Sequence, residues 1–204
     1  MRRYVTLVFA AMLVWTGGIL PGRPAAGAAV PLLPAGAFEI VPGDSSVTFA
    51  VPDNRGGFTG HTTRITGRVT IEPEAAGETY TAQVAAVIDA RSITTDSAIR
   101  DGAMRTTYLR TWEFPTITFT GMVTAHPGLG VRPFPAAVAG RLTIRTVTRD
   151  EAFSATVIAL AREYLADVST TVRMADYQIP YPRTFIFVAR DPVTVKLHIL
   201  ARQP

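Results

Sequence analysis

Hydrophobic and polar residues alternate with a period of two along most of this 204-residue chain. The pattern is typical of β-strands that bury one face, because successive side chains of a strand point to opposite sides of the sheet. Turn residues at 42–44, 73–77 and 149–151 separate the runs. The sequence therefore predicts about eight antiparallel strands. The alternating runs cover residues 46–51, 64–71, 80–88, 117–119, 138–144, 153–159 and 193–199, and less regular extended segments cover 38–40 and 166–172.

A single sheet of this size is expected to close into a barrel, since closure removes the exposed edges. An eight-stranded barrel has an interior just wide enough to be filled by side chains or to hold one small ligand. Small residues on the predicted inner faces favour a cavity, although alternating small and large side chains also fill a solid barrel. A barrel that spans an outer membrane would carry aromatic girdles, which are missing here, so we expect a soluble barrel. The small inward residues are Gly67, Ala82, Ala86, Gly140, Ala155 and Ala159.

The N-terminal residues have the order of a secretory signal peptide. Arg2 and Arg3 precede an apolar run over residues 5–20 and then small residues at 25–29. This run is shorter than the roughly 20 residues of a spanning helix, although an uncleaved membrane anchor is the alternative. We expect a signal peptide over 1–28, a flexible leader over 29–36 and a barrel domain over 37–204. The protein is predicted to be periplasmic or secreted, without stable membrane insertion after signal removal.

Charge and composition narrow the range of partners. Residues 1–28 contain three Arg and no acidic residue, so their removal lowers the net charge from +4 to +1. No run of Lys and Arg forms the basic patch that nucleic acids require, and nucleic acid is not an expected partner. The chain has no Cys, so packing must stabilise it without disulfides. A monomer and a homodimer both remain open.

The sequence lacks the common catalytic motifs. It contains no Cys nucleophile, no Gly-x-Ser-x-Gly elbow, no His-Glu-x-x-His and no phosphate-binding loop. His61, His126 and His198 lie far apart without metal-ligand spacing, and the acidic pair Asp150-Glu151 is expected in a turn. We therefore predict no catalytic residue, no metal site and no cofactor, and a protein that is not an enzyme.

Residues 99–119, read as IRDGAMRTTYLRTWEFPTITF, interrupt the strand pattern. Thr95 or Asp96 is suited to cap a short helix, which Gly102 weakens midway. Pro115 disfavours helical backbone at Phe114, after which the alternation resumes. The order strand, short helix, strand is predicted for this part of the chain.

This interrupted segment also resembles a family motif. The matching residues are Arg100-Asp101, Leu109, Trp112, Phe114-Pro115 and Ile117-Thr118-Phe119, and weaker blocks follow the family order at 38–40, 44–49, 65–71, 140–145, 147–148, 176–179 and 191–195. Together they resemble the YceI-like family of secreted bacterial polyisoprenoid-binding proteins, which are similar to lipocalins in architecture. The resemblance implies an all-β, eight-stranded antiparallel lipocalin-like barrel with a short helix inserted mid-chain.

The resemblance further implies non-enzymatic binding, carriage or sequestration of a long amphiphilic lipid in the barrel. Such a lipid is a polyisoprenoid, an isoprenoid quinone or a polyprenyl phosphate. Arg100 and Arg105 are expected near the rim, where the planar guanidinium suits a phosphate head group. Two alternatives remain, a small barrel isomerase or hydrolase with an apolar substrate and a solid barrel that serves as an interaction module. The inward residues expected to contact the lipid are Phe49, Phe58, Val69, Ile71, Val84, Ile88, Met104, Leu109, Phe114, Phe119, Leu142, Ile144, Phe153 and Val157.

Overall fold

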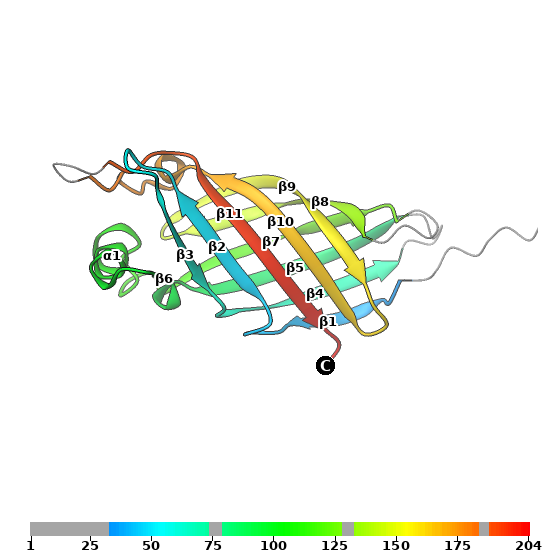
Figure 1. The fold of residues 1–204 in the computed structure, drawn as a ribbon. Coiled ribbons are helices and arrows are strands. Elements are labelled where there is room, and N and C mark those ends of the chain that lie inside the picture. The colour runs from blue at the N-terminus through cyan, green and yellow to red at the C-terminus, as the bar shows by residue number, and fades with distance from the viewer. Residues whose placement is uncertain (1–32, 74–78, 128–132, 184–187) are drawn as a thin grey trace, which may run out of the picture.

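Antiparallel strands follow one another around a single sheet, and its two ends meet where β1 pairs with β11 (Figure 1). This computed structural model describes residues 33–73, 79–127, 133–183 and 188–204, so the predicted signal peptide lies outside the described residues. The strands are β1 (Gly36–Ile40), β2 (Ser46–Val51), β3 (Phe58–Thr62), β4 (Ile65–Pro73), β5 (Tyr80–Asp89), β6 (Thr94–Thr95), β7 (Thr116–Ala125), β8 (Phe134–Ile144), β9 (Val147–Ala159), β10 (Glu163–Val172) and β11 (Val193–Arg202).

These strands occupy eight positions around the barrel. β1 and β2 both pair with β11, and the next two strands pair with them in the same way, β4 with β1 and β3 with β2. β5 pairs with β4, and β6 pairs with β3. Three of the eight positions are therefore each occupied by two strand segments with a break between them: β1 with β2, β4 with β3, and β5 with β6. The predicted eight-stranded antiparallel barrel is confirmed.

A buried serine holds the interruption between β1 and β2 against β11. Ser45 is fully buried. Its hydroxyl donates to the carbonyl oxygen of Leu200 at 3.3 Å and accepts from the amide of the same residue at 3.0 Å. The Leu200 amide thereby gains a partner at the break in the strand, while the Leu200 carbonyl oxygen also accepts from the Val41 amide at 2.9 Å.

The strand predictions differ from the structure at the turn after β8, at β3 and at the two-residue β6, which was also not predicted. The expected turn at 149–151 lies within β9, and the chain instead reverses at Arg145, which has a φ of 57°. The charged residues at 149–151 lie on a solvent-exposed part of β9. Because turns are also rich in charged residues, the sequence alone predicted a turn there. β3 was not predicted, because its inward residues Phe58, Gly60 and Thr62 show no hydrophobic period.

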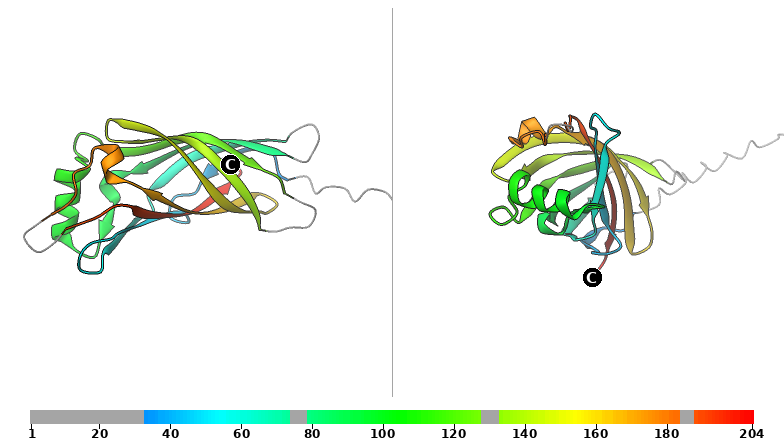
Figure 2. Two further views of the ribbon diagram at one scale, coloured as in Figure 1. Left: turned by 90° about the horizontal axis from the view of Figure 1, so that it is seen from above. Right: turned by 60° about the vertical axis from the view of Figure 1, so that its left-hand side comes forward.

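A helical segment lies across one end of the barrel (Figure 2). It contains α1 (Ala98–Ala103) and the π-helical turn η2 (Met104–Tyr108), and shorter 3₁₀ turns occur at η1 (Ala90–Ser92) and η3 (Met174–Tyr177). Ser97 caps α1 by accepting from the amide of Arg100, in place of the predicted Thr95 or Asp96. We call the end that carries α1 and η2 the helix end. Among the described residues, no helix is long and apolar enough to cross a membrane.

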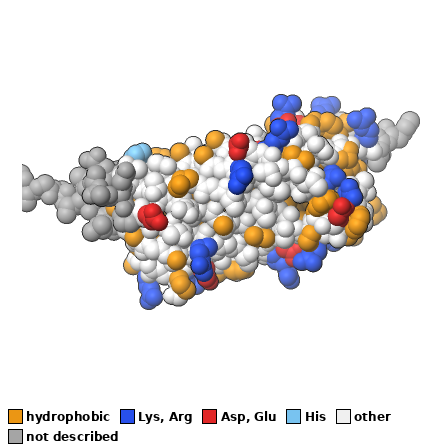
Figure 3. All heavy atoms as spheres, turned by 180° about the vertical axis from the view of Figure 1, so that it is seen from behind, with side chains coloured by type: hydrophobic (Ala, Val, Ile, Leu, Met, Phe, Trp, Pro, Cys, Tyr) orange, Lys and Arg blue, Asp and Glu red, His pale blue; other side chains and the backbone are white. Residues whose placement is uncertain are grey.

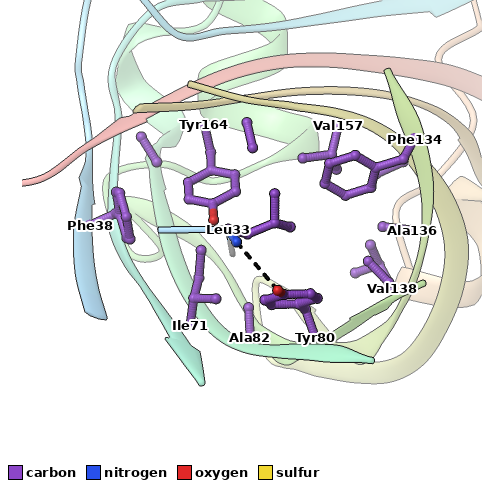
Figure 4. Close-up of a cluster of buried hydrophobic side chains, with 14 residues drawn as sticks. Leu33, Phe38, Ile71, Tyr80, Ala82, Phe134, Ala136, Val138, Val157 and Tyr164 are labelled. Carbon is purple, nitrogen blue, oxygen red and sulfur yellow. Dashed lines mark hydrogen bonds between the residues drawn. The ribbon is translucent and has the colours of Figure 1, made fainter. Parts of the chain in front are cut away.

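The opposite end is filled by a buried cluster that includes Phe38, Tyr80, Phe134 and Tyr164 (Figure 4). The expected leader reaches this cluster. Leu33 is buried, and its amide donates to the hydroxyl of Tyr80 at 3.3 Å. The hydroxyl of Tyr164 donates to the carbonyl oxygen of Pro34 at 2.6 Å, and burial raises the pKa of Tyr164. The packed part of the chain therefore begins before residue 37, since Leu33 supplies apolar surface to the core.

Candidate ligand-binding cavity

The barrel encloses a cavity of about 630 Å³ that extends from the buried cluster to α1. This volume lies within the range of about 300–1,000 Å³ that is typical of ligand pockets. Aliphatic and aromatic side chains from the inner faces of the strands form most of its wall. The charged residues among the described lining are Arg100 and Arg183. The interior is therefore an apolar tunnel with its cationic groups at one end.

Most of the inward residues predicted from the sequence line this cavity. Phe114 does not line the cavity. Its amide donates to the carbonyl oxygen of Arg110 in a turn before β7, so the inward alternation of that strand does not extend to its side chain. Its ring lies 5.5 Å from the guanidinium of Arg110 and 5.9 Å from that of Arg145. The residues that do line the cavity are Phe49, Phe58, Val69, Ile71, Val84, Ile88, Met104, Leu109, Phe119, Leu142, Ile144, Phe153 and Val157.

Two aromatic rings of the cavity wall pack directly over glycines, because a glycine has no Cβ to occupy that space. A Cβ at Gly60 would lie 2.4 Å from the ring of Phe49, and one at Gly140 would lie 2.7 Å from the ring of Phe119. The rings therefore lie over bare backbone, an arrangement in which an aromatic side chain covers a glycine of the neighbouring strand. The sequence predicted Gly140 as an inward residue but not Gly60. Both rings lie close to the wall, which leaves the centre of the barrel open.

We expect Gly140→Val to destabilise the barrel by about 1–3 kcal/mol, as overpacked cores typically do. The new Cβ would lie 2.4 Å from the carbonyl oxygen of Thr120 and 2.6 Å from the Cα of Gly121, both of which are backbone atoms that have little freedom to move. The control is Ala139→Val on the exposed face of the same strand. Urea unfolding measures the difference, and equal midpoints for the two variants would contradict this account of the wall.

Asp101 attaches α1 to the barrel. Its buried carboxylate accepts hydrogen bonds from the Thr94 hydroxyl, the Thr95 amide and the Thr95 hydroxyl, each at 2.7 Å. Burial acts to raise the pKa of Asp101, but these hydrogen bonds and the charge of Arg105 outweigh it and lower the pKa. The carboxylate is thus ionised at neutral pH and joins α1 to β6.

Two arginines fasten the rest of the helical segment. Arg105 donates through Nη2 to the carbonyl oxygen of Ile93 at 2.9 Å and lies 4.0 Å from the carboxylate of Asp101. Arg145 donates through Nη1 to the carbonyl oxygens of Gln178 at 3.1 Å and Tyr108 at 3.5 Å. The sequence placed Arg105 at a head group, but this side chain does not line the cavity and binds protein backbone instead.

Arg100 marks the mouth of the cavity. Its guanidinium lies 4.3 Å from the centre of the Phe58 ring, a cation–π contact, and both residues line the cavity. Ile99 also lines the cavity although it is 87% exposed. The apolar interior therefore reaches solvent beside α1. We call this opening, defined by Ser97, Ile99, Arg100 and Ala103, the mouth.

The described lining contains no Asp, Glu or His. His126 instead contacts the hydroxyl of Thr79 at 3.1 Å, and His198 contacts the carboxylate of Asp167 at 2.7 Å, in exposed positions. Within the described part of the chain, no three His, Cys, Asp or Glu residues are grouped to hold a metal ion. What the cavity offers chemically is burial of apolar surface, with cationic hydrogen-bond donors at its mouth.

A closed eight-stranded barrel around an apolar cavity is the architecture of ligand-binding β-barrel proteins. Residues 38–201 match the YceI-like domain, and the chain belongs to the YceI-like family. No curated protein matches the sequence.

Solved structures share the fold at low sequence identity. BcnA from Burkholderia cenocepacia is 17% identical with a TM-score of 0.62, and the match covers 79% of this chain and 98% of that one. A polyisoprenoid binding domain from Saccharophagus degradans is 18% identical with a TM-score of 0.59, over 84% of this chain and 100% of that one. The YceI protein of Campylobacter jejuni is 15% identical with a TM-score of 0.54, over 71% and 84%.

Proposed function

We propose that this protein binds a long-chain amphiphilic isoprenoid in the barrel cavity and carries or sequesters it outside the cytoplasm, without catalysing a reaction. The ligand is a polyisoprenoid, an isoprenoid quinone or a polyprenyl phosphate. The observation that carries this proposal is the apolar cavity of about 630 Å³, whose charged lining residues lie at one end. The structural similarity to a polyisoprenoid binding domain supports the same ligand class.

The energetics suit an isoprenoid tail. Each buried methylene contributes about 0.8 kcal/mol, so ten of them contribute about 8 kcal/mol before the costs of association. This stabilisation has no directional requirement, which fits a wall of aliphatic and aromatic groups. The polar head would remain at the mouth, where Arg100 offers a planar set of donors to a phosphate. A carrier of this kind needs no acid or base inside the cavity.

The location outside the cytoplasm is supported by the signal-like N-terminal sequence. We expect the protein from the periplasm or medium of its host to begin near residue 29. N-terminal sequencing of fractionated protein measures this. An intact residue 1 on protein that remains in the cytoplasm would contradict the proposed location.

Native mass spectrometry with lipid extraction tests the ligand. Protein purified from a bacterial host is expected to carry an isoprenoid at a stoichiometry of about one per barrel, as a cavity of this size allows. Ligand-free protein that also fails to take up added polyprenol and polyprenyl phosphate would contradict the proposed function. We expect Arg100→Gln to weaken the phosphate by about tenfold, or 1.4 kcal/mol, and to leave the neutral polyprenol unchanged. Equal losses for both lipids would remove Arg100 from the head-group site.

A further inference from the structure

Exposed apolar side chains gather at the helix end. Ile99 is 87% exposed and Trp112 is 72% exposed, more than any other large hydrophobic residue in the described part of the chain, and Val188 is 40% exposed. Met122, by comparison, is 46% exposed on the outer wall of β7. Single exposed hydrophobics are ordinary, whereas a group of them at one site marks an interaction surface. We call Ile99, Trp112 and Val188 the apolar rim.

The residues of the apolar rim lie in or near segments that line the cavity. Ile99 itself lines the cavity beside Arg100. Trp112 follows the lining residue Leu109, with the Arg110 guanidinium 5.6 Å from its ring. Val188 forms a β-bridge with the lining residue Arg183. The rim therefore lies at the same end of the barrel as the mouth, and Ile99 belongs to both.

The cations at this end point to an anionic partner. Arg55, Arg183 and Arg190 are exposed and, like Arg100, form no ion pair within the described residues. Figure 3 shows Lys or Arg side chains next to hydrophobic ones at this end of the molecule. Hydrogen bonds from the amides of Gly57 and Arg55, together with the charges of Arg55 and Arg100, lower the pKa of Asp53. Because these two arginines form no ion-pair contact in the part of the chain that the structure describes, their guanidinium groups keep donors that can bind groups outside the protein.

Several acids at the same end are bonded within the fold. Asp53 accepts from the amides of Arg55 and Gly57 at 2.6 and 2.8 Å. Asp191 accepts from the amide of Met174 and from the hydroxyl of Tyr181, at 2.8 and 2.7 Å. Asp101 of α1 is buried, as described above, although Asp96 and Asp176 are exposed. The negative charge of the bonded carboxylates is therefore partly compensated inside the protein, while the arginines face solvent.

We propose that the helix end docks on the surface of an anionic lipid bilayer. An exposed Trp and an aliphatic residue suit the boundary between head groups and acyl chains, and surface arginines are attracted by anionic lipids. This inference rests on the proposed function, because an isoprenoid that is insoluble in water needs a direct path between bilayer and cavity. Docking at the mouth supplies that path.

Co-sedimentation with vesicles of phosphatidylethanolamine and phosphatidylglycerol, free of isoprenoid, tests the docking. The wild-type protein is expected to sediment with these vesicles, and less at high salt, because salt screens surface charge. The double variant Ile99→Asp/Trp112→Asp is expected to lose about tenfold or more in vesicle affinity, since it removes two apolar anchors and adds repulsive charge. Met122→Asp/Leu160→Asp, which adds the same two charges at exposed hydrophobic positions away from the helix end, is the matched control and should lose much less.

Two results would overturn the proposed docking: wild-type protein that does not sediment with the vesicles, or three proteins with equal vesicle affinity. Sedimentation velocity adds a check, because a rim that joins two copies would give a wild-type dimer and a monomeric double variant, without vesicle binding. Uptake of polyprenol from cyclodextrin is measured in parallel for all three proteins. Uptake without vesicle binding contradicts only the docking, whereas vesicle binding without uptake contradicts the proposed function.

Discussion

Replacing Ala86 by Trp is expected to abolish measurable isoprenoid binding while the barrel stays folded. Ala86 is on the inner face of β5 and lines the cavity, and its cross-strand neighbours are Gly67 and Phe119. The new indole would extend into the lumen, where it would occupy the path of the lipid tail. The cost to stability should stay within the 1–3 kcal/mol typical of overpacking, because the cavity accommodates the ring.

The matched control is Ala85→Trp, one residue earlier on the exposed face of the same strand. We expect it to leave lipid binding unchanged. Titration of both variants with a fluorescent polyprenol measures affinity, and circular dichroism with thermal unfolding verifies the fold. Full binding by folded Ala86→Trp protein would place the ligand elsewhere than in the barrel.

Replacing Asp101 by Ala is expected to lower the free energy of unfolding by about 2–4 kcal/mol, because hydrogen bonds to a buried charge are strong and their loss leaves buried donors unpaired. Thr94 and Thr95 would lose a shared acceptor on which three hydrogen bonds of 2.7 Å converge. Hydrogen exchange should show the largest loss of protection in α1 and β6. Urea unfolding measures the global change.

The control is Asp96→Asn, an exposed position that should change stability by less than about 0.5 kcal/mol. A pH series tests the charge on Asp101, whose pKa is lowered from its ordinary value of 3.8 in the folded protein. Its stabilisation is therefore complete above about pH 3.8 and is lost as the pH falls through the lower, folded-state value. An Asp101→Ala deficit that is the same at pH 7 and at the lowest pH would contradict this account.

The barrel itself was predictable from short stretches of sequence. Alternation along β5 placed Ala82, Val84, Ala86 and Ile88 on one face, and all of them line the cavity. This works because the side-chain period of a strand is two, so one buried residue determines the side on which its neighbours lie. β3 and β6 were missed, since short strands with Gly and Thr at inward positions carry no hydrophobic period.

The candidate site was predictable as a set of wall residues but not in its arrangement at the helix end. Arg100 and Arg105 are close in sequence, yet one lines the mouth and the other donates to the carbonyl oxygen of Ile93. Phe114 is not part of the cavity wall, because it belongs to the turn that precedes β7. Local sequence does not encode such differences, because they depend on which distant backbone groups need a partner.

The sequence by itself determined the strand phases, the inward set of residues and the family, because these depend on local periodicity and on motif order. Tertiary structure alone decided where the cavity opens. The mouth exists because the Asp101 carboxylate holds α1 against β6 while Ile99 remains in solvent. The openness of the lumen likewise depends on Gly60 and Gly140 receiving rings from other strands. Contacts between residues far apart in the chain control both features, and a linear pattern does not show them.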